Sequence, residues 1–289
     1  MSPSQPDAPR GVLSPPADAE GIENERFVPG PELAPFVAHF WTVRWDLRGK
    51  PAFVAETLPH PCVHLLFERG RAQVAGVSTR IFRRRLRGQD RVFGIKFRPA
   101  AFHPFLRGPL FRLRDRVLSL ASVFGAASHG VRQAILGEPD IRRCVTLAEA
   151  FLLERLPAMP KETQELRDLV ERLATDQTIT RVEQAAALAG VDVRTLQRRF
   201  SAAVGVSPKW VIQRYRLHEA AERLSEAKSP DLASLALQLG YFDQPHFIRS
   251  FKAMTGRAPG VHVARRMGKA SRGVSHPTAG RKDQERKPP

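Results

Sequence analysis

The sequence predicts an α+β fold, in which a β-rich N-terminal domain precedes an all-α C-terminal domain with two helix-turn-helix units joined by a linker helix. Three observations predict it. Short apolar runs separated by Gly and Pro fill residues 27–116, and helical spacing of apolar residues begins at Leu118. One pattern also occurs twice between Ala186 and Phe251. At 289 residues, the chain is long enough for two domains, each with a core of its own.

Both ends of the chain are predicted to lack structure. Residues 1–25 contain five prolines and are expected to form a disordered leader. Residues 268–289 combine Lys and Arg with Gly, Ser and Pro, and are expected to form a disordered basic tail. The start lacks a signal-peptide core, and the longest low-charge run, 117–131, is shorter than the roughly 20 apolar residues that span a bilayer. We therefore expect a soluble, cytoplasmic protein with no membrane partner.

Residues 26–158 are predicted to form the first domain, which is β-rich and ends in helices. The expected strands lie at 36–43, 63–67, 73–77 and 92–97. Residues 80–116 carry 12 basic and 2 acidic side chains. Within them, Arg83-Arg84-Arg85 is expected in a solvated loop between strands, and a supplementary DNA contact is the alternative.

The sequence predicts no catalytic residue, no metal ligand and no cofactor. Its two cysteines, Cys62 and Cys144, provide neither a disulfide framework nor paired metal ligands, and we interpret Cys62 as a small core residue. The first domain contains four histidines that could be considered as metal ligands: His39, His60, His64 and His103. Their spacing in the sequence is not that of a metal-binding cluster.

Residues 162–267 are predicted to form the second domain, which begins with the first helix-turn-helix unit. Thr180 is expected as the N-cap of its first helix, with Glu183 in capping-box position, and Asp192 as the N-cap of its second helix. The apolar face of the second helix is expected at Leu196, Phe200 and Val204. The opposite, outward face carries Arg194, Gln197 and Arg198.

The second unit repeats this layout. Its offset from the first is 50 residues between Ala186 and Ala236 but 51 between Phe200 and Phe251, so its turn is one residue longer. Phe247, Phe251 and Met254 are expected to face inward, and we also assign Tyr241, Phe242 and Trp210 to the core. Pro245 fits the first helical turn. The outward candidates are Gln244, His246, Arg249 and, near phosphate, Lys252.

A single helix from Pro208 to about Ala227 is predicted between the units, with Leu217, Ala220, Ala221 and Leu224 on one face. Its length of roughly 25–30 Å could hold two recognition helices about one DNA turn (~34 Å) apart. A net charge of +17 favours a polyanionic partner. Because Arg and Gln pair with guanine and adenine edges, the pattern indicates a reader of double-stranded DNA.

The second domain resembles the AraC/XylS family of transcription regulators. The resemblance covers about residues 165–266 and lies in Leu196-Gln197-Arg198-Arg199-Phe200, Gly205-Val206-Ser207-Pro208, Gly240-Tyr241, Asp243-Gln244-Pro245-His246-Phe247 and Phe251-Lys252. It implies seven helices and two units that enter successive major grooves. It also implies base contacts from the outward residues named above for each unit. Leu235 and Pro245 depart from the family's usual Ile and Ser, and Pro245 removes a hydroxyl contact.

Residues 27–125 are similar to the β-rich domain found ahead of such DNA-binding domains. The likeness lies in Phe36 to Trp41, Leu58-Pro59, Leu65-Leu66-Phe67 and Gly94-Ile95-Lys96-Phe97-Arg98-Pro99. It implies a domain that senses a small-molecule effector or forms a homodimer. Ala100-Ala101 stands where the family usually has Gly-Gly.

The sequence thus indicates a sequence-specific DNA-binding regulator rather than an enzyme. Two alternatives remain open at this point. One is a DNA-targeted enzyme with repair or metal-dependent chemistry in residues 27–125. The other is an architectural DNA binder without any effector.

Overall fold

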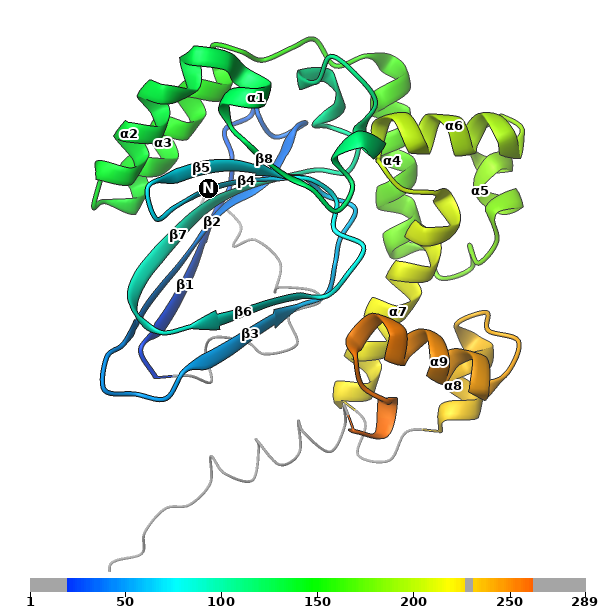
Figure 1. The fold of residues 1–289 in the computed structure, drawn as a ribbon. Helices are drawn as coiled ribbons and strands as arrows, with labels where there is room; N and C mark the ends of the chain where they lie inside the picture. Colours follow the sequence, from blue (N-terminus) through cyan, green and yellow to red (C-terminus); the bar gives the residue numbers. More distant parts are fainter. Residues whose placement is uncertain (1–19, 227–230, 262–289) are drawn as a thin grey trace, which may run out of the picture.

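The structure is a computed structural model that describes residues 20–226 and 231–261. The predicted basic tail at 268–289 and residues 1–19 of the predicted leader lie outside the described residues. The fold class predicted from the sequence is confirmed: antiparallel sheets occupy the N-terminal half and helices the C-terminal half (Figure 1).

The N-terminal half contains a six-stranded sheet in the order β1-β2-β7-β4-β5-β8 and a two-stranded sheet of β3 and β6. Its strands are β1 (Ile22–Phe27), β2 (Val37–Leu47), β3 (Phe53–Thr57), β4 (His64–Glu68), β5 (Arg71–Ala75), β6 (Phe82–Leu86), β7 (Gly88–Phe97) and β8 (Val117–Ser119). At the centre, Trp41 of β2 lies opposite Gly94 of β7. A Cβ atom at Gly94 would lie 2.2 Å from the Trp41 ring, so this close packing requires glycine.

Two sequence expectations for this half were wrong. The leader was expected to extend to residue 25, but β1 begins at Ile22, whose buried side chain joins a core cluster with Trp45. Arg83-Arg84-Arg85 was expected in a loop, but it belongs to β6, which pairs with β3. Carboxylates on other strands make this charged strand possible, because Glu56 pairs with Arg83 and Glu68 with Arg84.

The loop after β7 retains a conformation that favours glycine. Ala100 is buried and has a φ of 64°, in the left-handed region that side chains seldom adopt. The family's Gly-Gly would be unstrained here, whereas Ala100-Ala101 fills the core instead.

Short helical segments follow the sheet and lead into longer helices. They are η2 (His103–Phe105), η3 (Leu110–Leu113), α1 (Ala121–Phe124), η4 (Gly125–Ala127), α2 (Ser128–Gly137) and α3 (Ile141–Leu153). Figure 1 shows α2 and α3 packed beside β4 and β5.

The C-terminal half is helical. Its helices are α4 (Lys161–Thr175), α5 (Val182–Leu188), α6 (Val193–Ala203), α7 (Pro208–Glu226), α8 (Leu232–Gln238) and α9 (Gln244–Thr255). Residues 259–261 are also helical. In Figure 1, α5 and α6 lie at one end of α7, and α8 and α9 lie at the other.

The hydrophobic core does not follow the predicted boundary between domains. One continuous cluster runs from Leu33 and Phe97 in the sheet region through Val170 of α4 to Phe200 of α6 and Ile212 of α7. A separate, smaller cluster surrounds Phe247 and Phe251 of α9. The N-terminal half and the first helix-turn-helix unit therefore share one core. Apolar spacing identifies the buried face of an element but does not identify which other element covers it.

Within the described residues, none of the helices has both the length and the apolar character needed to cross a membrane.

Candidate nucleic-acid interface

The first helix-turn-helix unit consists of α5, a tight turn and α6. Gly190 has a φ of 63°, and the amide of Val191 donates to the carbonyl of Ala186 at 3.1 Å. Asp192 then caps α6, as predicted, because its carboxylate accepts from the amide and the hydroxyl of Thr195 at 2.9 and 2.7 Å. These hydrogen bonds from Thr195 lower the pKa of Asp192, so the cap stays ionised near neutral pH.

The cap of α5 differs from the prediction. The N-cap is Arg181 rather than Thr180. Gln184, rather than Glu183, reaches back, and its Oε1 accepts from the amides of Thr180 and Arg181 at 3.0 and 2.9 Å. The prediction was wrong by one residue because helix ends cannot be located more closely from sequence patterns.

The two faces of α6 are as predicted. Leu196 and Phe200 have no exposed surface, and Val204 just beyond the helix is also fully buried. Arg194, Gln197 and Arg198 lie on the exposed side. Arg199 differs from these, because its Nε lies 2.6 Å from Glu162 of α4. This ion pair joins α6 to α4, so we do not count Arg199 among the outward candidates.

The second unit repeats this arrangement with α8 and α9. The predicted inward residues Phe247, Phe251 and Met254 are buried. Asp243 caps α9 by accepting from the amide of His246 at 2.6 Å, and Pro245 lies in the first turn of the helix, as predicted.

The outward candidates of α9 differ in their exposure. Arg249 and Lys252 are exposed, whereas Gln244 and His246 are half-buried. The His246 ring packs edge-on against Tyr241, with 5.2 Å between ring centroids. This contact holds the imidazole at the start of the helix.

One aromatic residue is not where the sequence suggested. Tyr241 is buried and Trp210 packs, half-buried, against the core, as predicted, but Phe242 is 88% exposed. The Trp210 ring lies 4.5 Å from the guanidinium carbon of Arg214. Assigning Phe242 to the core was wrong because the assignment followed residue type, whereas its position in the turn determines its exposure.

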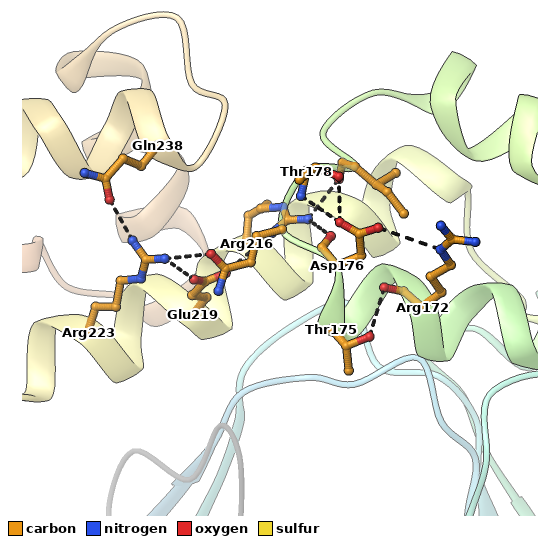
Figure 2. A network of polar contacts seen from close by, with 10 residues as sticks. Arg172, Thr175, Asp176, Thr178, Arg216, Glu219, Arg223 and Gln238 are labelled. Atoms are coloured by element: carbon orange, nitrogen blue, oxygen red, sulfur yellow. Dashed lines mark hydrogen bonds and ion pairs between the residues drawn. The ribbon is translucent and has the colours of Figure 1, made fainter.

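A polar network fixes the linker helix α7 to both units (Figure 2). Arg223 donates to Gln238 of α8 and to Gln177 of the loop before α5, each at 2.8 Å, and pairs with Glu219. Arg216 is buried and donates to the carbonyls of Asp176 and Ile179. Arginines on one helix thus bind α8 of the second unit and the loop that precedes the first unit.

The second unit also contacts the N-terminal half. Glu56 of β3 is buried between Arg83 of β6 and Arg257 beyond α9. Leu58 inserts its buried side chain into the core cluster of the second unit. The ring of His218 lies 3.1 Å from the carbonyl of Pro59. These contacts tie the end of α9 to the two-stranded sheet.

The residues considered for chemistry have environments that suit packing. Burial lowers the pKa of His39 and of His64 to about 3 and raises the pKa of Cys62. Since the thiolate is the nucleophilic form, a buried Cys62 with a raised pKa is unsuited to attack. Among residues 20–226 and 231–261, no three His, Cys, Asp or Glu side chains are grouped so as to hold a metal ion.

Comparisons with known proteins agree with this geometry. A helix-turn-helix domain family matches residues 185–265, and a domain of unknown function, DUF6597, matches residues 25–119. No curated protein matches the chain.

Solved structures of similar proteins include two that cover little more than a third of this chain. An AraC-type transcriptional regulator from Chromobacterium violaceum is 22% identical over 35% of this chain and 91% of its own, with a TM-score of 0.33. The C-terminal domain of the response regulator AraT from Geobacillus stearothermophilus is also 22% identical, over 37% and 88%, with a TM-score of 0.33. ToxT from Vibrio cholerae is 9% identical over 85% of this chain and 98% of its own, with a TM-score of 0.38.

The family match and the paired turn geometry define a protein that binds DNA through two helix-turn-helix units. Residues 185–265 are an AraC-type helix-turn-helix DNA-binding domain, and a DUF6597 domain at residues 25–119 lies ahead of it.

Proposed function

We propose that α6 and α9 read base edges in two successive major grooves. In α6 the readers are Arg194, Gln197 and Arg198, which lie on the exposed face opposite the buried Leu196 and Phe200. In α9 they are Gln244, His246 and Arg249, with Lys252 near phosphate. Arg and Gln side chains make paired hydrogen bonds to guanine and adenine, so these residue types suit base reading.

The placement of both units on α7 is the observation that carries the proposal. With 19 residues, α7 is roughly 28 Å long, close to one turn of DNA. The network around Arg216 and Arg223 supports a fixed placement of the two units (Figure 2). Lys and Arg contacts to phosphate would add salt-dependent affinity, as the net charge of +17 favours.

Arg198→Ala tests base reading. We expect it to weaken binding to the cognate site by about 1–3 kcal/mol and to relax selectivity at one base position. Arg143→Ala, which removes an exposed arginine from α3, is the matched control and should leave selectivity unchanged. Sites selected from random duplex DNA would be compared for the two variants. If Arg198→Ala lost affinity equally for every sequence, the base-reading role would be contradicted.

We further propose that the chain is divided into an N-terminal domain that begins with β1 and ends near residue 158 and a DNA-binding domain over 162–267, and that an effector binds where they meet. An open cleft of about 320 Å³ lies there. Lys96 and Arg98 line it together with Cys62, Ala174 and Tyr215. Two cations beside apolar side chains suit a small carboxylate with an apolar body. Arg98 also forms an ion pair with Glu171 of α4 at 2.7 Å, for which such a ligand would compete.

Thermal unfolding with a panel of aliphatic and aromatic carboxylates tests the effector site. We expect at least one to raise the melting temperature of the wild type and to have little effect on Lys96→Met. A melting temperature that is indifferent to the whole panel would contradict the effector and favour an architectural DNA binder.

The cytoplasm is the location that this function requires, because the DNA is there. The homodimer predicted from the sequence stays a prediction. The selected DNA sites also test it, because a dimer would require the two-groove site to occur twice.

A further inference from the structure

The turns of the two helix-turn-helix units match residue by residue, except at one position. The amide of Val191 donates to Ala186, and the amide of Tyr241 donates to Ala236, exactly 50 residues further along in both donor and acceptor. The N-caps that follow are Asp192 and Asp243, which are 51 residues apart. The extra residue of the second turn therefore lies between Tyr241 and Asp243. It is Phe242.

This inserted residue is the most exposed large apolar side chain in the described part of the chain. Its exposed fraction is 88%, and Leu237 of α8 follows at 66%. The inserted position removes Phe242 from the second core cluster, which its neighbour Tyr241 joins. An aromatic side chain so exposed loses the stabilisation that burial would give, which suggests that it is buried in a complex.

Phe242 is also placed at the end of α9 that approaches DNA. It immediately precedes Asp243, the N-cap of this helix. The N-terminal residues of a recognition helix are those that contact base edges. Phenylalanine offers no hydrogen bond to a base, but its ring packs against the C5-methyl group of thymine, the apolar feature of the major groove.

We propose that Phe242 is a specificity-determining residue that packs on a thymine methyl group in the groove entered by α9. The inference rests on the proposed function and extends it. DNA is the favoured occupant because the chain binds DNA and the exposed residues Arg249 and Lys252 of the same helix are basic. The contact would give the second unit a means of selecting sequence in place of the hydroxyl that Pro245 lacks.

Replacing single thymines by uracil tests this contact, because the change removes only the methyl group. A cognate duplex selected by the wild type would be substituted at one thymine at a time, and dissociation constants would be measured. We expect the wild type to lose about fourfold in affinity at one position in the second groove, as for one buried methyl-sized group. Phe242→Ala should bind the thymine and uracil duplexes equally at that position.

Leu237→Ala is the matched control, since it removes another exposed apolar side chain from the same unit. It should keep the wild-type preference for thymine. Circular dichroism would establish that both variants fold. The inference would be overturned if Phe242→Ala kept the thymine preference, weakened all duplexes equally or left DNA binding unchanged, the last result pointing to a protein partner.

The two proposals can fail separately. If Arg198→Ala relaxes one base position while Phe242→Ala leaves thymine discrimination intact, only the role of Phe242 is wrong. If both variants lose affinity uniformly, base reading by the two helices is wrong.

Discussion

The two helix-turn-helix units have nearly the same backbone but are anchored in different ways. The first unit shares the continuous core that extends from the sheet region through α4 to Phe200. The second unit has a smaller core around Phe247 and Phe251, which it shares with Leu217 and Leu224 of α7 and which Leu58 of the N-terminal half enters. Polar contacts add to this packing: the Glu56 ion pairs and the Arg223 network.

This difference indicates that the positions of the two units respond differently to perturbation. Apolar packing fixes the first unit to the scaffold, so its position changes only if the core is disrupted. The second unit packs on α7, but polar contacts and the inserted Leu58 make up most of its connection to the N-terminal half, and such contacts respond to pH, ligands and single substitutions. We therefore expect an event in the N-terminal half to change the position of the second unit more readily than that of the first.

Phe200→Ala and Phe251→Ala test the difference most strongly. Both phenylalanines are fully buried, and each cavity should cost about 3–5 kcal/mol. We expect Phe200→Ala to destabilise the sheet region and the first unit together. Phe251→Ala should unfold the second unit and leave the rest folded. Amide hydrogen exchange under native conditions measures this region by region. The comparison fails if both variants weaken protection in the same amides.

Glu56→Gln tests the polar anchor. Burial alone would raise the pKa of Glu56, but hydrogen bonds and charge from Arg257 and Arg83 outweigh it and lower the pKa below the ordinary 4.5. The ionised form therefore stabilises docking above pH 4.5, and this contribution is lost as the pH falls through the lowered pKa. We expect the variant to lose about 1.5–3 kcal/mol at pH 7 and to approach the wild type as the pH falls below 4.5.

Urea unfolding of the second unit across this pH range measures the effect. Asp168→Asn is the control, because this residue pairs only with its neighbour Arg167 among the ion pairs of the described residues. A wild-type advantage that is unchanged at low pH would rule out the ion pair as its source.

Arg223→Ala should have the smallest effect on stability. The side chain is about one-third exposed, so we expect the free energy of unfolding to fall by roughly 0.2–1 kcal/mol. Binding to the full two-groove site should weaken, while binding to a duplex that holds only the first subsite should not. Titration of the two duplexes separates these cases, and an equal loss on both would argue against a coupling role.

Much of the C-terminal half could be predicted from the sequence. Apolar residues at three- and four-residue spacing located α6, α7 and α9, and their buried faces agree with the structure. Asp192 was identified as a cap because a short acidic side chain precedes an apolar run.

The features that were missed depend on partners distant in the sequence. Strand β6 is charged, and Glu56 and Glu68, which pair with it, lie 27 and 16 residues away. Arg198 and Arg199 look equivalent in the sequence, yet only Arg199 is paired with Glu162. The exposure of Phe242 could have been inferred from the extra residue in the second turn, had that residue been located.

The central claim is that α7 holds two DNA readers in one rigid frame. Lengthening the DNA between the two subsites tests it most directly, with affinity measured by titration. An insertion of about 5 base pairs rotates the second subsite to the opposite face of the duplex. An insertion of about 10 base pairs returns it to the original face but places it one full helical turn further from the first subsite. We predict that both insertions reduce affinity to that of the first subsite alone. Recovery of affinity with the longer insertion would contradict the rigid frame, because only a flexible link could span it.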